Sequence, residues 1–590
     1  MNLPFKSRSS INTRIDNFRL ALAHLDALPQ LSVLSLIIGS ATALLIVLFR
    51  QAIELPFSFS SLSSAESFEE IPTVTRCIII MTGGLIIALV MQWLPSSQRQ
   101  MSVGHVIDRT HNHQGSLPFK NWLAQYVLAI ICIISGQSVG REGPAVHIGA
   151  GCASLFGKWM RLPKNSMQSL IACGVASGIA ASFDTPMAGV IFAMEVILLD
   201  YSIVGFVPVI LSSVVGAAIS RAMLGEISHF RIGDSGIGSL SELGFVVVMG
   251  FFIAMIAGTY IRLNILTAKL TRYPIFFRVL VAAGLCAAAS WFAPEIMGLG
   301  YDTIEASLAG EIAILSLIVI AFTKLFVSPI VVGLGIPGGL IGPALFIGAC
   351  VGAIAGNSAN ALFPNMDVNP NLYILLGMTG MMAAVVNAPL AALVAVLELS
   401  FNSQIIFPAM LMIVIACIVT RTTFKVQGIF VEQLNVSGRQ LEMTPAAKAL
   451  RRAGVTSIMD RQFSHSPTTL QQHEASQLLQ TQPNWIVYED QETIFALAAA
   501  DLAHKLNEET DNSELDEFNL AEIPGRCFLL GIVNESDSLY DALSLIEKSA
   551  CDAIAVIRHT SSREKQIRGI ITREAINNYY RPKGLNHAMG

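Results

Sequence analysis

The chain has 590 residues, of which 53% are hydrophobic and only 13% are charged. Soluble domains usually carry about a quarter charged residues, so most of this chain must face lipid or other apolar helices, which excludes a wholly water-soluble protein. The formal net charge of −5 offers no basic face of the kind that binds nucleic acid.

The first 30 residues are mostly polar and contain the basic side chains Lys6, Arg8, Arg14 and Arg19. This stretch is too long and too polar to be a signal peptide. Basic residues that flank membrane spans favour the cytoplasmic side. We therefore expect residues 1–30 to form a cytoplasmic segment.

Apolar runs follow between residues 31 and 436. A span needs about 20 residues to cross a hydrocarbon core of about 30 Å. The runs that reach or approach this length are Leu31–Leu48, Cys77–Trp93, Leu243–Ile261, Phe277–Phe292 and Leu315–Gly335, the last interrupted by Lys324. Two more runs, Ile131–Phe156 and Ile336–Gly356, are broken by Gly and Pro. Broken helices at membrane depth are tolerated where they are buried or line an aqueous cavity, which is typical of a transporter or channel.

Two windows of the membrane region recur. Gly143–Ala150 (GPAVHIGA) returns as Gly342–Ala349 (GPALFIGA), with six of the eight positions identical, and Gly174–Glu195 aligns without a gap to Gly377–Glu398. Two matches in the same order indicate an internal duplication, with repeats at about 31–225 and 240–436. Membrane duplications with interrupted segments often fold as inverted repeats whose half-helix N-termini point at an anionic substrate.

The recurring GPA segments have the chemistry of such half-helix starts. A helix N-terminus offers free N–H donors and about half a positive charge, so an anion is stabilised there without a full cation. Glycine lets the anion approach the backbone, and Pro144 and Pro343 suit the first turn of a helix. Each repeat is therefore predicted to direct one helix start at a shared anion site.

A carboxylate, Glu142, stands beside the first of these helix starts in the string Gly140–Pro144 (GREGP). A charge inside a membrane is expensive and usually functional. An ionised carboxylate at an anion-binding helix start would compete with the permeant ion and act as a gate. The structural alternative is an ion pair between Glu142 and Arg141 within a turn.

The GREGP string, the second string Gly338–Pro343 (GGLIGP) and the duplication resemble the CLC family of chloride channels and chloride/proton exchangers. The resemblance implies an all-α, multi-pass membrane domain of two inverted repeats with broken helices at 31–436. The lack of a sorting signal and the small number of loops favour the cell (inner) membrane, and we expect both termini to be cytoplasmic. The resemblance also implies chloride as the ligand and a homodimer with one pore per subunit. The family's gating glutamate falls on Glu142.

The resemblance further implies which residues contact the anion. They are Ser102, Gly140, Arg141, Gly143, Leu340, Ile341 and Phe430. Three of these positions depart from the family pattern. Ile341 stands where the family has Phe, which matters little because the donors there are backbone N–H groups. Ser102 lies in a Met-Ser-Val-Gly-His context where the family prefers Gly-Ser-Gly-Ile-Pro, and Phe430 replaces a tyrosine and so lacks the O–H donor.

A further departure concerns protons. Exchangers of the family have two successive glutamates where this chain has Glu195 and Val196, and the second one relays protons. Valine cannot bind a proton, which favours a passive channel gated by Glu142. An exchanger that uses another internal route, such as Glu195 or a chain of waters, is the alternative. The repeat partner of Glu195, Glu398, favours a structural role for that pair.

The composition changes after Leu434, and residues 441–590 are predicted to form a soluble cytoplasmic α/β appendage. We expect helices at Thr469–Leu479 and Leu539–Lys548, strands at Trp485–Tyr488, Ala553–Ile557 and Ile567–Ile571, and an acidic loop at Asp511–Glu522. The appendage resembles a pair of CBS domains. In such pairs a Thr and a following Asp bind adenine nucleotide. Asp501 and Thr572 occupy these places, but Ala498 and Ala575 stand where their partners belong, so nucleotide binding and simple dimer contacts both remain open.

No other cofactor is indicated. His105, His111 and His113 surround Asp108 in what we expect to be a polar loop, not a metal site, and His147 is expected to pack in the core. The sequence contains no HExxH motif, and no Ser/His or paired-Asp arrangement stands out in the apolar runs, which speaks against an intramembrane enzyme. A cation transporter would need clustered carboxylates, of which the apolar runs offer few.

Overall fold

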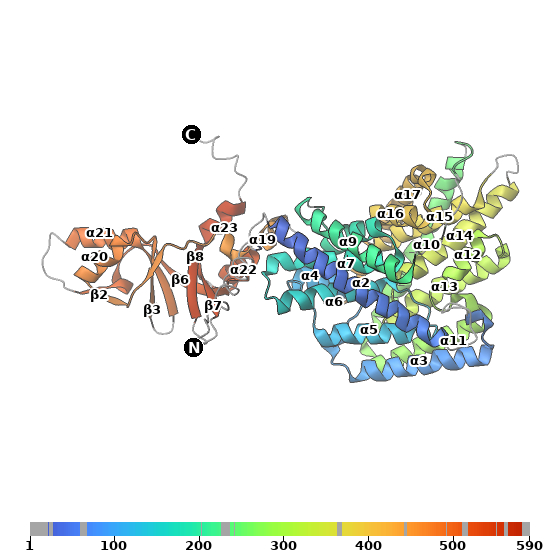
Figure 1. Cartoon of the computed structure of the whole chain (residues 1–590), viewed down its shortest axis with the longest axis horizontal. Helices are drawn as coiled ribbons and strands as arrows, with labels where there is room; N and C mark the ends of the chain where they lie inside the picture. Colours follow the sequence, from blue (N-terminus) through green and yellow to red (C-terminus); the bar gives the residue numbers. More distant parts are fainter. Residues whose placement is uncertain are drawn as a thin grey trace, which may run out of the picture. The chain divides into compact units, whose positions relative to one another are not determined.

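The structure, a computed structural model, describes Leu22 and residues 27–580 except for 59–67, 202, 226–229, 231–235, 241, 363–367, 440, 442–444, 491–492, 510–516, 550 and 560–564. The predicted N-terminal segment therefore lies almost wholly outside the described residues. The chain divides into a helical unit, Leu31–Trp159 with Gln168–Leu441, and a second unit made of Met1–Gln30, Met160–Met167 and Glu442–Gly590. Figure 1 labels their elements.

The first half of the helical unit begins with two long helices and continues with shorter ones. Its elements are α2 (Leu28–Ser58), η1 (Phe68–Glu70), α3 (Thr73–Trp93), η2 (Ser96–Gln98), α4 (Val103–Asn112), α5 (Phe119–Ile134), α6 (Glu142–Trp159), α7 (Lys164–Phe183), α8 (Pro186–Phe192), a π-helix η3 (Ala193–Leu198) and α9 (Ile203–Leu224).

The second half has the same succession of long, broken and short helices. Its elements are α10 (Glu242–Ala268), η4 (Leu270–Arg272), α11 (Ile275–Phe292), η5 (Pro294–Ile296), α12 (Tyr301–Leu308), α13 (Ile314–Leu334), α14 (Ile341–Leu362), α15 (Pro370–Val386), α16 (Pro389–Ser400), η6 (Ser403–Ile405), α17 (Ile406–Phe424) and α18 (Ile429–Val436). Among the described residues, nine helical segments are long and apolar enough to span a membrane, and each unbroken run predicted from the sequence lies in a helix.

The recurring windows form the same structure in both halves. A helix ends at Ile134 in one half and at Leu334 in the other, and after a short break the next helix begins at Glu142 or Ile341. Helix pairs α6–α7 and α14–α15 then cross with their backbones in contact. A Cβ on Gly149 would lie 2.1 Å from the carbonyl oxygen of Gly174. The equivalent Cβ on Gly348 would lie 2.4 Å from that of Gly377. The repeated glycines are therefore required by two equivalent helix crossings.

The second unit contains a mixed sheet, as predicted for an α/β appendage. Its elements are α19 (Pro445–Arg452), η7 (Val455–Ser457), β1 (Phe463–His465), β2 (Thr469–Gln471), α20 (Gln472–Gln480), β3 (Trp485–Asp490), β4 (Thr493–Ala498), α21 (Ala499–Glu509), β5 (Glu517–Asn519), η8 (Leu520–Glu522), β6 (Cys527–Asn534), α22 (Leu539–Ser549), β7 (Ala553–His559), β8 (Lys565–Thr572) and α23 (Arg573–Tyr580).

The strand order β1-β3-β4-β6-β7-β8 contains one pattern twice. In each half the first strand runs parallel to the second, and the second runs antiparallel to the third. This agrees with an appendage of two similar halves, as the resemblance to a pair of domains implies, and Figure 1 shows the strands side by side.

Two predicted elements of this unit need correction. The first three residues of the expected helix at 469–479 form strand β2, which pairs with β5, and α20 begins only at Gln472. The expected loop at 511–522 includes strand β5 and the turn η8, while its residues 511–516 lie outside the described part. Both errors come from β2 and β5, whose pairing is non-local and leaves no periodic signal in three residues.

Candidate anion pathway

The two helix breaks meet inside the helical unit. Gly140 and Gly339 exchange both backbone hydrogen bonds, at 2.9 and 2.8 Å, so the segments that lead into α6 and α14 lie side by side. A Cβ on Gly143 would lie 3.0 Å from the Cα of Gly339. This close backbone approach needs glycine. The two helix starts predicted from the GPA segments are thus brought together.

Glu142 is the first residue of α6, and its side chain is only 5% exposed. Its Oε1 accepts a hydrogen bond of 2.7 Å from the hydroxyl of Tyr301. A Cβ on Gly140 would lie 2.0 Å from Oε2, and a Cβ on Gly342 would lie 2.7 Å from Oε1. The carboxylate therefore lies against the start of α14, where the N–H donors of a helix would otherwise face an anion.

Arg141 does not form the turn-stabilising ion pair with Glu142 that was considered as an alternative. Among the described residues its guanidinium lies over the rings of Phe183 and Tyr301, 4.7 and 5.1 Å from their centroids. Its side chain is buried, and its Nε and Nη2 have no hydrogen-bond partner in the described part of the chain. Arg141 thus places buried positive charge and free donors beside the carboxylate of Glu142.

Tyr301 is a residue that the sequence analysis missed. It follows Gly300, whose φ is +78°, and begins the short helix α12. Its ring is 4% exposed and meets the edges of Phe183 and Phe230. A Gly-Leu-Gly turn before a lone tyrosine is the only local signal. The hydrogen bond to Glu142 spans 159 residues and cannot be read from that signal.

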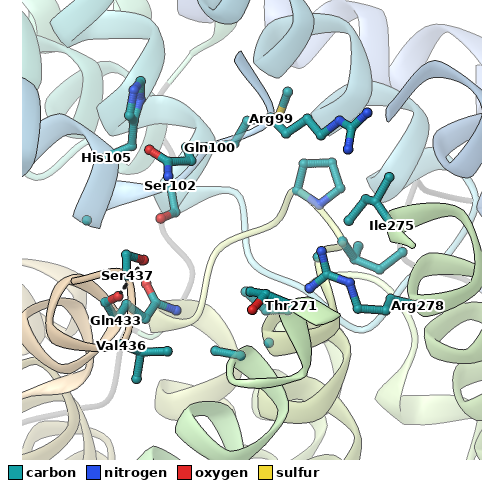
Figure 2. A pocket seen from close by; sticks show the side chains of 18 of the residues that line it. Arg99, Gln100, Ser102, His105, Thr271, Ile275, Arg278, Gln433, Val436 and Ser437 are labelled. Carbon is teal, nitrogen blue, oxygen red and sulfur yellow. Dashed lines mark hydrogen bonds between the residues drawn. The ribbon is translucent and has the colours of Figure 1, made fainter. Parts of the chain in front are cut away.

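A cavity of about 400 Å³ opens beside Ser102. Ser102 precedes α4 with φ 109° and ψ 175°, and its side chain makes no capping hydrogen bond. This backbone conformation is almost confined to glycine. Helix capping by the Ser102 side chain therefore does not explain why the strain is tolerated. The cavity also reaches Gly338 and Gln433. Figure 2 shows Ser102 at its wall between His105 and Gln433.

Phe430 belongs to the same end of the pathway as Ser102. It is the second residue of α18 and is 3% exposed. A Cβ on Gly104 would lie 3.5 Å from the carbonyl oxygen of Phe430, so the starts of α4 and α18 are neighbours. Gly428, with φ +108°, lets the chain turn there against the carbonyl of Val386.

Leu340 and Ile341 connect the two ends of the pathway. Both are buried, and the hydroxyl of Tyr260 donates a hydrogen bond of 3.0 Å to the carbonyl oxygen of Leu340. They follow Gly338, which lines the cavity, and Gly339, which pairs with Gly140. The predicted site residues thus form two groups joined by residues 338–341. One surrounds Glu142, the predicted gate, and is called the gate group; the other surrounds Ser102 and is called the cavity group.

Comparisons with known proteins identify the family. The sequence profile described as voltage gated chloride channel matches residues 83–421. The chain belongs to this family. A ClcB-like chloride channel protein of Ralstonia nicotianae is 28% identical over 410 residues, which cover 66% of this chain and 93% of that protein. The H(+)/Cl(−) exchange transporter ClcA of Salmonella arizonae is also 28% identical, over 46% of this chain and 60% of ClcA.

Two solved structures show the same CLC fold. A slow cyanobacterial Cl⁻/H⁺ antiporter has a TM-score of 0.62 at 20% identity and covers 69% of this chain and 98% of its own. A eukaryotic CLC transporter has a TM-score of 0.57 at 19% identity and covers 92% of this chain and 97% of its own. The protein is therefore a multi-pass CLC protein of chloride transport and not an enzyme.

At the position where CLC exchangers carry their second glutamate, Val196 is buried in the π-helix η3. The side chain of its neighbour Glu195 binds to the start of α16. Its two carboxylate oxygens accept hydrogen bonds from the backbone N–H groups of Leu390 and Ala391 at 3.3 and 2.7 Å. A carboxylate held by two donors at a helix start is favourable for the helix. The structural role predicted for Glu195 agrees with this geometry.

The histidines near Asp108 lie on helix α4, and the expectation of a polar loop is wrong for His105 and His111. Asp108 forms an ion pair with Arg439. The Nδ1 of His105 lies 3.1 Å from the Nε2 of His147, and the two rings stack. His147 is fully buried in α6, as expected. The pair connects a helix that lines the cavity with the helix that begins at Glu142.

In the appendage the two predicted nucleotide residues have local partners. Oδ2 of Asp501 accepts the backbone N–H of Arg526 at 2.6 Å, and Oγ1 of Thr572 accepts that of Ala575 at 3.2 Å. Asp501 is the third residue of α21, and Thr572 ends β8 just before α23. They thus occupy strand-to-helix junctions of the two halves, and nucleotide binding stays a prediction.

Proposed function

We propose that this CLC protein conducts chloride passively and that Glu142 is its gate. The single observation that carries the proposal is the place of the Glu142 carboxylate, which lies against the start of α14 at the glycine bridge between the two halves. An ionised carboxylate there excludes a chloride ion because it fills the space beside the helix start and repels a second negative charge. When the side chain moves away, the donors of both helix starts become available to the ion.

The absence of the second glutamate supports a channel over an exchanger. Val196 cannot bind a proton, and the oxygens of Glu195 already accept two backbone hydrogen bonds. A proton carrier needs a side chain that changes protonation while facing water on one side. Val196 does not meet this requirement, and the carboxylate of Glu195 is engaged at the start of α16.

A chloride/proton exchanger is the second candidate, and one observation favours it. His105 lines the cavity and lies within hydrogen-bond distance of His147 on α6, so a chain of imidazoles leads from the cavity to the helix of Glu142. One of the relatives at 28% identity is named an H(+)/Cl(−) exchange transporter. A proton path along these histidines would replace the missing glutamate.

Chloride efflux from liposomes with external pH recorded at the same time separates the two candidates. A channel releases chloride without moving protons, and Glu142→Gln makes this efflux insensitive to pH. Proton uptake against its gradient, driven by chloride, would establish the exchanger. His147→Phe then tests the imidazole path, because it removes both ring nitrogens of His147 and keeps an aromatic ring, although a larger one. Absence of chloride flux in every condition would contradict both candidates.

The remaining expectations form part of the same proposal. We place the protein in the cell (inner) membrane as a homodimer with one pore per subunit and both termini in the cytoplasm. The appendage is proposed to be a CBS pair whose two half sites, at Asp501 and Thr572, bind adenine nucleotide weakly or not at all. Protease accessibility in right-side-out and inverted vesicles tests the orientation, and cross-linking in the membrane tests the dimer.

A further inference from the structure

The cavity beside Ser102 is far larger than one chloride ion requires. Its volume of about 400 Å³ falls in the range of about 300–1,000 Å³ that is typical of sites for small molecules. Three arginines line it, Arg99, Arg278 and Arg439, and none of its described lining residues is acidic. Arg439 is neutralised by Asp108. The other two arginines leave the cavity with uncompensated positive charge.

Arg99 and Arg278 reach the cavity from the same end of two packed helices. Arg76 near the start of α3 donates to the carbonyl oxygen of Ser290 near the end of α11, so the two helices run antiparallel. Arg99 follows the end of α3 and Arg278 lies in the first turn of α11. Figure 2 shows both guanidinium groups on one side of the cavity, across from Gln433 and Ser437.

The two guanidinium groups have donors left for a ligand. Arg99 donates through Nε and Nη2 to the carbonyl oxygens of Leu94 and Gln92. These bonds fix the orientation of its guanidinium group and leave Nη1 available to a ligand. The side chain of Arg278 has no hydrogen-bond or ion-pair partner among the described residues, and its Nε is buried. A buried donor without a partner is costly, so these groups fit a bound anion better than an empty cavity.

We propose that Arg99 and Arg278 bind a phosphate-type oxyanion in this cavity and that its binding hinders the access of chloride to Ser102. Planar guanidinium forks match two oxygens of one phosphate group, whereas a chloride ion offers only one centre. The effect on chloride rests on the proposed function, but the binding itself does not.

A phosphate group can reach this cavity from two sources, the aqueous solution and the membrane lipid. Inorganic phosphate or a soluble phosphate ester reaches an open cavity from water. A phospholipid headgroup is the other source, because large aromatic side chains are exposed at the same end of α3 and α11, namely Trp93 at 87% and Phe277 at 61%. Exposed Trp and other aromatic residues are typical of the membrane–water interface.

Binding is measured on the purified full-length protein so that no transport is needed. Isothermal titration with inorganic phosphate tests the soluble source, and native mass spectrometry after exchange into phosphatidic acid tests the lipid source. We expect Arg99→Gln and Arg278→Gln each to weaken binding about ten-fold, as for the loss of one charge-assisted hydrogen bond. Arg278→Lys keeps the positive charge but loses the planar guanidinium group with its paired N–H donors, so this variant should bind phosphate less tightly than the wild type.

Arg272→Gln is the matched control, because Arg272 is a nearby exposed arginine that bonds and stacks on Tyr273. Binding of phosphate alone assigns the soluble source, and retention of phosphatidic acid alone assigns the lipid. Equal binding of both ligands by wild type, Arg99→Gln and Arg278→Gln overturns the proposal, as does no binding of either. In liposomes, bound phosphate should slow chloride efflux of the wild type more than that of Arg278→Gln. Failure of efflux with intact binding would count against the proposed function alone.

Discussion

Glu195 and Glu398 cap helices of each other's repeat. The carboxylate of Glu195, in the first half, accepts two backbone N–H groups at the start of α16, at 3.3 and 2.7 Å. That of Glu398, in the second half, accepts two at the start of α8, both at 2.8 Å. Each half therefore completes a helix N-terminus of the other. This exchange explains why both glutamates recur in the repeat.

We predict that Glu195→Gln and Glu398→Gln each destabilise the protein by about 1–2 kcal/mol, because a neutral amide loses the charge-assisted bonds and the interaction with the helix dipole. The melting temperature of the purified protein measures this loss, and chloride efflux should persist. Glu311→Gln at an exposed position is the control. If Glu195→Gln abolished proton movement and left the melting temperature unchanged, Glu195 would belong to a proton path instead.

Tyr301 is predicted to hold the gate closed. Tyr301→Phe removes the hydrogen bond of 2.7 Å to Glu142 and keeps the ring under Arg141. A hydrogen bond to a charged group contributes about 1.5–3 kcal/mol, so chloride efflux should rise roughly ten-fold or more. Tyr373→Phe is the control, since Tyr373 bonds to Glu242 outside the gate group. In a Glu142→Gln background Tyr301→Phe should add nothing; an equal increase there would mean that Tyr301 acts on something else.

Glu69 is predicted to make stability depend on pH near neutrality. Partial burial, and then the negative charges of Asp302 and Glu295, raise the pKa of its carboxyl from 4.5 to about 7. A raised pKa means that the folded protein holds a proton that the unfolded chain releases. The stabilisation is complete below pH 4.5 and is lost as the pH rises through 7.

The melting temperature of the wild type should therefore fall between pH 5 and pH 8. Glu69→Gln should flatten this part of the profile, whereas Glu70→Gln at the neighbouring position should not, although both side chains are exposed. A profile that falls equally steeply in Glu69→Gln would assign the pH dependence to other groups.

The membrane fold was predictable because its signals repeat or extend over many residues. Runs such as Cys77–Trp93 are long, and the similarity of the two GPA segments reveals one internal duplication. The helix starts at Glu142 and Ile341 follow from Gly and Pro at fixed places. These features are local, so one sequence is enough to see them.

The site was predictable only in part, because its contacts are non-local. Nothing near Tyr301 tells that its hydroxyl meets Glu142, and nothing near Arg99 tells that it shares a cavity with Arg278. Short strands such as β2 and β5 depend on each other in the same way. A resemblance to a family supplied Ser102 and Phe430, whose roles stay predictions, but a resemblance cannot supply residues that the family pattern does not contain.

Val196 provides the most direct test of the proton question. Val196→Glu restores a carboxylate at the position that CLC exchangers use, on an element that contacts α4. If the missing carboxylate alone prevents coupling, chloride efflux from liposomes should now be accompanied by proton movement that the wild type lacks. Burial of the new carboxyl should also lower the melting temperature, because a buried charge without a partner is destabilising. Val196→Gln has a similar volume and no ionisable group, so it should lose stability without moving protons. Chloride efflux without proton movement in Val196→Glu would mean that the chain lacks more of the path than this one side chain.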